Sequence, residues 1–273
     1  MKRNLKSRYF FFIIYCSLSL IPIIWLFLLS IRTNNTIMTN ALEIPKEFHF
    51  ENYITTWKSL TIGHHLLNTF LISILALIIG LIFTIFTSYL IARFNFPGKN
   101  AIYLFFLAGL TLPTYTAIYP LFIGLQALHM YNKMWSLSLI YAGFTVPISV
   151  LIMVGFMKNI PKELEEAAYM DGAGVFTIFF KIIVPLSKPA IFTVATLTFL
   201  TAYWNDFILA AVLISDPAKT NISVAIASTV TDKGVNYVTM AAAVMMSIVP
   251  EIIAFLIFQK YIISGLTMGA VKE

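Results

Sequence analysis

Long runs of apolar residues without charge constrain this chain more than any other feature. A helix needs about 20 apolar residues to cross a hydrocarbon core about 30 Å thick. Six segments reach that length, and spans are expected at residues 9–31, 66–92, 101–123, 135–157, 189–213 and 238–262. The chain is 59% hydrophobic and 11% charged, whereas soluble domains are about half apolar and about a quarter charged. We therefore expect an all-α membrane protein, with six transmembrane helices in a single domain over residues 1–273.

The third charge-free stretch, residues 100–132, is too long for one span. Pro113 and Pro120 lack a backbone donor, so they are expected to kink or end its helix. The span is therefore placed at residues 101–123, and the rest at the outer surface.

Lysines and arginines predict the orientation, because cytoplasmic loops of membrane proteins carry an excess of them. With the N-terminus inside, 12 of these residues face the cytoplasm and 6 face outward. Both termini are thus expected in the cytoplasm, with an outer segment at residues 32–65 and a cytoplasmic loop at 158–188. The inner set is Lys2, Arg3, Lys6, Arg8, Arg93, Lys99, Lys158, Lys162, Lys181, Lys188, Lys260 and Lys272, and the outer set is Arg32, Lys46, Lys58, Lys133, Lys219 and Lys233. The first span is too long for a signal peptide and is expected to remain uncleaved.

The loop at residues 158–188 is the one cytoplasmic loop long enough to present a folded element. Pro161 suits a first helical turn, and acidic residues follow it where the helix dipole favours negative charge. Ala167 and Ala168 continue the helix, and Gly172 and Gly174 can end it in a left-handed conformation. We expect about three turns, with a face of small side chains that another protein can approach closely. The alternative is a simple connector.

A second segment of this loop carries apolar residues at helical spacing. Phe176, Phe179, Phe180 and Ile183 repeat at i, i+3, i+4 and i+7, which predicts one apolar helical face. We expect this segment to lie along the inner membrane surface.

Several strings of the sequence resemble one family. Glu166-Ala167-Ala168, followed after three residues by Gly172 and then by Ile182 and Pro185, resembles the EAA signature of ATP-binding-cassette (ABC) importer permeases. The strings EAAYMDGAG with IIVPLSKPA, IPKEFHFENY, AYWNDFILA and FQKYIISGLTMGAVK are similar to the maltose and multiple-sugar class, and to its shorter, MalG-like permease. Val184 and Glu273 depart from the family, which usually has leucine and glycine there.

The resemblance implies a type I ABC importer permease fold in a bacterial cytoplasmic membrane. It implies a second homologous permease, two ATPase subunits, an extracellular solute-binding protein and a sugar substrate. The EAA helix would dock an ATPase subunit through Glu165, Glu166, Ala167, Ala168, Asp171 and Gly172.

The chain lacks the GxxxxGK[ST] phosphate loop, so ATP and magnesium would bind to partner ATPase chains. We expect no cofactor on this chain, no catalytic residues, no metal site, no enzymatic activity and no nucleic-acid partner. Its basic residues flank apolar runs instead, close to the lipid bilayer.

Two acidic residues fall inside expected spans, where an ionisable group is by default a functional candidate. Asp206 lies about 25 Å along the fifth helix from Pro189 and is preceded by Tyr203, Trp204 and Asn205. Aromatic faces and a few polar groups suit a sugar, so we assign these four residues to the substrate pathway; an interfacial aromatic belt with a snorkelling acid is the alternative.

Glu251 follows Pro250 in the middle of the sixth span. We expect it to face the pathway or a subunit interface, and a structural hydrogen bond to another helix is the alternative.

Two other functional classes fit less well. A secondary transporter driven by an ion gradient would be expected to carry paired intramembrane carboxylates or an internal repeat. A membrane enzyme or scaffold would carry a cluster of titratable groups at one depth. Neither feature is found in the sequence.

Overall fold

The computed structural model describes residues 3–232 and 234–270, and their side chains over 9–232 and 234–259. Over these residues the chain is almost wholly helical, apart from a small hairpin in which β1 (Val230–Thr231) pairs antiparallel with β2 (Gly234–Val235). The chain forms two compact units, Met1–His64 with Val224–Pro250 and His65–Ser223 with Glu251–Glu273. The basic residues predicted at positions 2 and 272, and the side chains of residues 260–262 in the predicted sixth span, lie outside this description.

Four described helices are long and apolar enough to cross a membrane. They are Tyr9–Ser30 of α1 (Arg3–Ser30), α4 (Ile62–Arg93), α7 (Met134–Lys158) and Tyr237–Gln259 of α14 (Tyr237–Ala270). Two further spans are possible in the described part if each of two bent helix pairs counts as one. The predicted third span, residues 101–123, lies within the first bent pair, whereas the predicted fifth span, residues 189–213, overlaps only the second helix of the other pair, Lys188–Tyr203.

The first unit contains α1, α2 (Asn34–Thr39), α3 (Glu51–Ser59), the hairpin and the first part of α14. Leu29, Ile37, Val238 and Ala241 form its buried apolar cluster. Asn34 donates to the Asn236 side chain at 2.9 Å and accepts from the Val238 N–H at 3.2 Å, which ties α2 to the start of α14.

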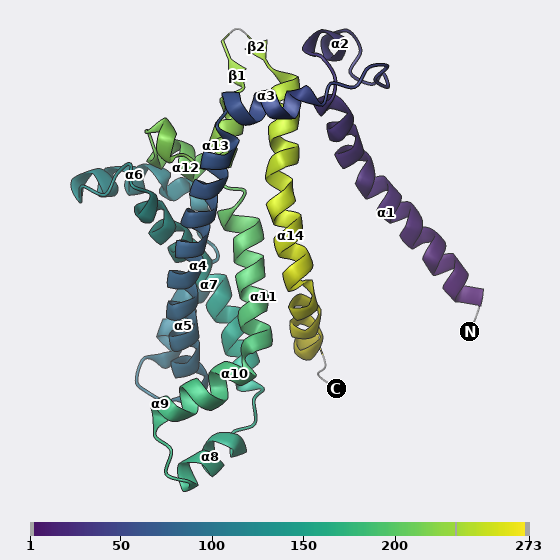
Figure 1. Ribbon diagram of the computed structural model, residues 1–273. Helices are drawn as coiled ribbons and strands as arrows, with labels where there is room; N and C mark the ends of the chain where they lie inside the picture. The colour runs from purple at the N-terminus through teal and green to yellow at the C-terminus, as the bar shows by residue number, and fades with distance from the viewer. Residues whose placement is uncertain (1–2, 233, 271–273) are drawn as a thin grey trace. The chain divides into compact units, whose positions relative to one another are not determined.

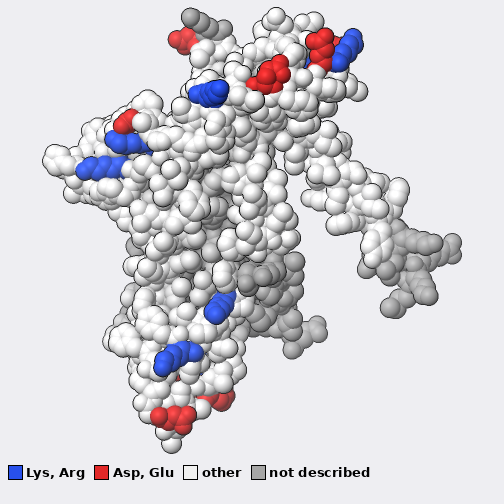
Figure 2. Space-filling model, viewed as in Figure 1, with Lys and Arg blue, Asp and Glu red and all other residues white. Residues whose placement is uncertain are grey.

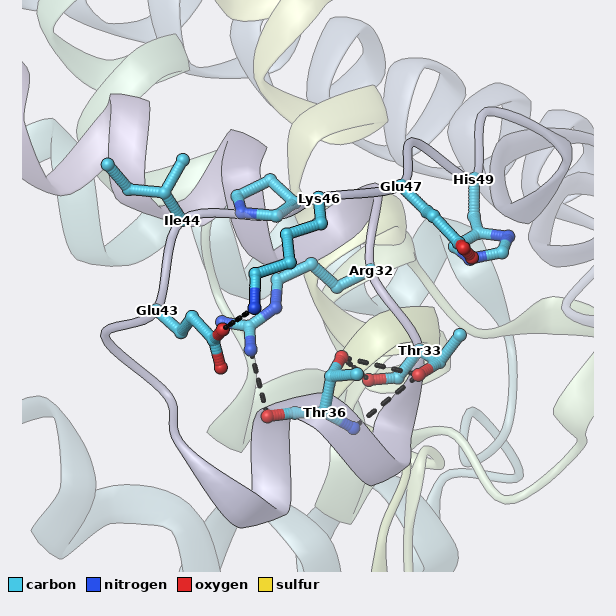
Figure 3. Close-up of a pocket in the computed structure, with 9 residues that line it drawn as sticks. Arg32, Thr33, Thr36, Glu43, Ile44, Lys46, Glu47 and His49 are labelled. Atoms are coloured by element: carbon cyan, nitrogen blue, oxygen red, sulfur yellow. Dashed lines mark hydrogen bonds and ion pairs between the residues drawn. The ribbon is translucent and has the colours of Figure 1, made fainter.

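The outer segment of this unit folds around Arg32, whose side chain is buried (Figure 3). Its guanidinium donates to the carbonyl oxygens of Thr36 and Asn40 at 2.8 Å and of Ala41 at 3.1 Å. The sequence predicts Arg32 only as an outer charge, whereas in the structure it organises this loop. Beside it lies a pocket of about 340 Å³ that also carries the Lys46–Glu43 ion pair, at 3.2 Å.

The second unit packs α4 closely against α7 through small residues. Ser73, Ala76, Thr84 and Ser88 are buried along α4, and Gly80 between them lies against Ala142 of α7. Small residues let membrane helices approach closely and form interhelical hydrogen bonds. The Ser138 hydroxyl accordingly donates to the Ile72 carbonyl at 3.0 Å.

The third predicted span is divided rather than continuous. Helix α5 (Lys99–Gly109) ends before Pro113, and η1 (Thr114–Ala117) with α6 (Ile118–Ala127) follows at a bend of 95°. Pro113 stands in the break, whereas Pro120 is tolerated because it lies in the first turn of α6, where no intrahelical donor is required.

The fifth predicted span is also broken. α9 (Val175–Ile178), η2 (Phe179–Ile183) and α10 (Val184–Leu186) precede a 67° bend into α11 (Lys188–Thr198) and η3 (Phe199–Tyr203). Residues 204–207 are not helical, and α12 (Ile208–Leu213) follows them. The segment then continues through η4 (Pro217–Lys219) into α13 (Ile222–Ala227).

The expected apolar face over residues 176–183 is split between two directions. Phe179 and Ile183 are buried against Met153 and Met157, whereas Phe176 and Phe180 are exposed. The expectation assumed regular α-helical spacing, but η2 has the wider i→i+5 turns of a π-helix, which change the register. This segment therefore belongs partly to the core and does not simply lie on a surface.

Candidate functional site

The predicted coupling helix is α8 (Glu163–Met170), which carries three acidic residues in its first turn. It has two turns rather than three and begins two residues after Pro161. Figure 1 shows α8 and α9 beyond the ends of α4 and α11. Figure 2 shows acidic side chains at this end of the unit.

The C-terminus of α8 has a complete glycine cap. Gly172 has φ +80°, its N–H donates to the Tyr169 carbonyl at 3.0 Å, and the Ala173 N–H donates to the Ala168 carbonyl at 2.9 Å. This pair of bonds with a left-handed residue is the Schellman motif. The predicted left-handed stop at Gly172 is confirmed, whereas Gly174 is extended.

The six predicted docking residues do not share one face. Glu166, Ala167, Asp171 and Gly172 are exposed, while Ala168 is half-buried against the core of the second unit. Exposed apolar side chains that sequence reasoning missed extend this outer surface, namely Leu164, Tyr169 and Met170, which is 88% exposed. The sequence signal for docking came only from the small and acidic residues of this helix.

Glu165 points inward, contrary to its predicted docking role. Nε of Arg93, at the end of α4, lies 2.6 Å from Oε1 of Glu165, and the two side chains are 5% and 11% exposed. The Tyr89 hydroxyl donates to Oε2 of Glu165 at 3.4 Å. The partner could not be found from local sequence patterns, because Arg93 belongs to a distant helix and was read only as an orienting charge.

Asp206 lies in the break after η3 and not within a continuous helix. Its Oδ2 accepts the Tyr141 hydroxyl at 2.7 Å and the Ala210 N–H at 2.9 Å, and its carbonyl accepts the Asn221 amide at 2.6 Å. Asp206 therefore joins α7, the start of α12 and the segment before α13. Tyr141 and Asn221 are part of this network and were not anticipated.

Tyr203 and Trp204 are buried within the second unit. The Tyr203 ring stacks on Tyr141 with centroids 5.8 Å apart, and its hydroxyl bonds to Thr145. Neither aromatic face is open to a sugar in this conformation, and neither forms an interfacial belt. Both side chains pack inside the unit, and their assignment to the substrate pathway stays a prediction.

Asn205 and Glu251 differ from these residues because they meet at the surface of the unit. Asn205 is exposed, Glu251 is half-buried, and a side-chain hydrogen bond joins them. The Asn205 amide also donates to the Leu200 carbonyl at 2.9 Å, which holds it at the end of η3. The hydrogen bond foreseen as the alternative for Glu251 is thus present, though to the break and not to a helix.

No group of three or more His, Cys, Asp or Glu side chains that could hold a metal ion occurs in the described part of the chain. On the loop after α12, the side chain of Lys219 and the Ala218 N–H hold the pKa of Asp216 below its usual range. This loop is an exposed, locally capped turn.

Comparisons with known proteins agree on one family. The diacetylchitobiose uptake permease protein NgcG of Streptomyces coelicolor is 30% identical over 95% of this chain and 86% of its own length. The trehalose transport permease protein SugB of Mycobacterium tuberculosis is 34% identical over 93% of each chain. The galactooligosaccharides transport permease protein GanQ of Bacillus subtilis is 33% identical over 92% of this chain and 89% of its own.

Solved structures show the same fold. A bacterial ABC transporter that imports the acidic polysaccharide alginate matches with a TM-score of 0.81 at 22% identity, over 93% of this chain and 95% of that one. An alginate transporter in complex with a pentasaccharide-bound periplasmic protein matches with a TM-score of 0.64 at 17% identity, over 92% and 94%. The model of the family "binding-protein-dependent transport system inner membrane component" matches residues 76–267. The chain belongs to this family of membrane components of binding-protein-dependent ABC importers.

Proposed function

We propose that this chain forms part of the translocation pathway for a sugar or oligosaccharide delivered by an extracellular binding protein. The observation that carries the proposal is the family match over residues 76–267, together with relatives named for the uptake of diacetylchitobiose, trehalose and galactooligosaccharides. The secondary transporter and the membrane enzyme are set aside, since the family is a component of ABC transport.

The proposed importer contains a second, homologous permease, two ATPase subunits and a solute-binding protein in the cell membrane. ATP and magnesium bind to the ATPase chains, because this chain has no phosphate loop. Both termini and α8 face the cytoplasm, as the distribution of basic residues predicts.

The outer surface of α8 is the proposed contact with an ATPase subunit. Glu166, Ala167 and Met170 present acidic, small and flexible apolar side chains on one short helix. A small residue among larger ones lets a partner approach the backbone, and Met adapts its shape to an apolar partner surface. Two broken helices on the same unit, α5–α6 and α11–α12, provide non-helical backbone that membrane proteins tolerate where it lines a cavity or is buried in protein.

Asn205 and Glu251 are the residues of this chain that we assign to the sugar. An amide and a carboxylate both hydrogen-bond hydroxyl groups, and the Asn205 amide is exposed within the non-helical segment 204–207. Tyr203, Trp204 and Asp206 support this segment from inside.

Reconstitution with the partner subunits tests the docking role. Ala167→Trp should reduce ATPase attachment and binding-protein-stimulated hydrolysis, because the new side chain overfills the contact. Thr177→Trp, at an exposed position on α9, is the matched control and should leave both unchanged. Full attachment in Ala167→Trp would contradict docking through this face of α8.

The substrate class needs a separate measurement. Mass spectrometry of the glycan that co-purifies with the native binding protein should identify a sugar, and ATP-dependent uptake of that sugar should persist when the proton gradient is collapsed. Uptake that follows the ion gradient and not ATP would contradict the importer mechanism.

A further inference from the structure

Helix α8 places few side chains in the core of the second unit. Its large apolar side chains, Leu164, Tyr169 and Met170, are all exposed. Ala168 and the following Ala173 contact the core, but each offers only a methyl group. The long side chain that reaches inward from α8 is Glu165.

Arg93 holds both ends of the connection that leads into α8. Its Nε lies 2.6 Å from Glu165, and its Nη2 donates to the Ile160 carbonyl at 2.7 Å, just after α7 ends. The planar guanidinium makes both contacts from one rigid group, which a lysine cannot do. The end of α7, the start of α8 and the end of α4 therefore meet at one side chain.

A second contact joins α4 to the loop on the far side of α8. Phe86 and Tyr89 pack on Phe179 of η2 with ring centroids 4.8 and 4.9 Å apart. The last two turns of α4 thus contact the coupling loop both before and after the exposed helix. The buried ion pair thus connects α4 to α8, and the aromatic stack connects α4 to the segment that follows α8.

We infer that Arg93 and Glu165 form a latch that transmits the movement of the ATPase from α8 to α4. They are positioning residues, distinct from the outer surface of α8 that meets the ATPase. This inference rests on the proposed docking of an ATPase subunit to α8. Buried ion pairs are weak sources of net stability, so a role in fixing geometry accounts better for this pair than a role in stability alone.

The test uses the complete importer in lipid, with the native sugar and binding protein. Glu165→Gln and Arg93→Lys are compared with Glu166→Gln, whose side chain is exposed on the same helix. Three quantities are measured: ATPase attachment, sugar transported per ATP hydrolysed, and the distance distribution between spin labels at Glu163 and Leu90, both exposed. Cys16 is replaced by alanine so that it takes no label.

The latch variants should keep the ATPase attached and hydrolysing, while sugar transported per ATP falls by about fivefold or more, the lower end of typical coupling between two sites. The distribution of distances between their two spin labels should become broader than in the wild type. Glu166→Gln should instead weaken attachment with unchanged transport per ATP hydrolysed by the attached complexes. An unchanged transport ratio in the latch variants, or loss of attachment equal to that of Glu166→Gln, would overturn the inference.

A double variant separates the loss of the ion pair from the cost of leaving one buried charge without a partner. Arg93→Met with Glu165→Leu removes both charges and leaves apolar groups that can pack. It should insert, attach the ATPase and remain uncoupled. Failure to insert, or a normal transport ratio, would show that the pair serves folding or packing and would equally overturn the latch. Failure of ATPase docking itself is recognised separately, by full attachment in Ala167→Trp.

Discussion

Replacing Gly172 with valine should weaken ATPase attachment by distorting the end of α8. Gly172 has φ +80°, and a Cβ added there would meet nothing within 4 Å. The obstacle is therefore backbone strain and not a collision. An L-residue in the left-handed region costs about 1–2 kcal/mol, and a β-branched side chain falls at the upper end.

The expected loss of affinity follows from this strain. If the free loop relaxes out of the left-handed conformation and docking requires that conformation, the strain lowers the affinity by up to a factor of about 5–30. Leaving the left-handed conformation would instead release the Tyr169 and Ala168 carbonyls from the cap.

Attachment is measured as the dissociation constant of the ATPase subunits from the reconstituted permease pair, together with stimulated hydrolysis. Gly174→Val is the matched control, since Gly174 has φ −73° and ψ 162°, where valine is unstrained. Gly172→Asn should lie closer to the wild type than Gly172→Val, because asparagine tolerates the left-handed region. Equal affinities for Gly172→Val and Gly174→Val would refute the argument that the cap positions α8.

Other expectations concern stability, transport and topology. Asp206→Ala should lower the free energy of unfolding by about 1–3 kcal/mol, because Tyr141 loses a buried acceptor; an unchanged melting temperature would oppose this. Asn205→Ala, at an exposed position, should lower the melting temperature less than Asp206→Ala and should slow uptake, and normal uptake kinetics would remove it from the pathway. The purified chain alone should bind no ATP, which equilibrium dialysis with labelled nucleotide can check. Reporter fusions after Trp57 should report the outside and after Asn159 the inside, and the opposite result would reverse the orientation.

Hydropathy predicts where the chain forms apolar helices, but not where its backbone leaves the helix. The break before Pro113 had a visible signal, because proline removes a donor. The break at residues 204–207 contains neither proline nor glycine. It is held by Asp206 and Asn221, whose bond depends on the folded tertiary structure. A charge-free stretch of sequence shows only that its residues are apolar. It does not show the tertiary hydrogen bonds that interrupt the helix.

The candidate residues show the same division between local and distant information. The left-handed stop at Gly172 was predicted because it depends on a local turn. Glu165 was assigned to the outside because local sequence shows only an acid in a first helical turn, which suits the dipole whichever way the side chain points. Its direction is set by Arg93 on another helix, and the burial of Tyr203 by Tyr141 and Thr145 on a third.

Helix α4 connects the Arg93–Glu165 pair to residues at the opposite end of the second unit, which the loop alone does not contact. It is continuous over 32 residues, about 48 Å, whereas α5–α6 and α11–α12 are interrupted. At its other end Asn68 donates to the Ala218 carbonyl at 2.9 Å, and the Thr69 hydroxyl accepts the Ile222 N–H at 2.8 Å. Asn221, next to Ile222, donates to the Asp206 carbonyl, so the same segment supports the break that carries Asn205.

Because α4 is an unbroken helix, a shift at its Arg93 end also shifts the contacts that Asn68 and Thr69 make at its other end. The interrupted helices around it can absorb small shifts, whereas an unbroken helix transmits them along its axis. Displacement of α8 would therefore reach residues 204–207 through α4 without any contact between the ATPase and the sugar. In this mechanism the ion pair at Arg93 transmits to α4 the displacement that accompanies ATP hydrolysis. The hydrogen bond of the Asn68 amide helps to carry that displacement from α4 to the segment that supports Asn205.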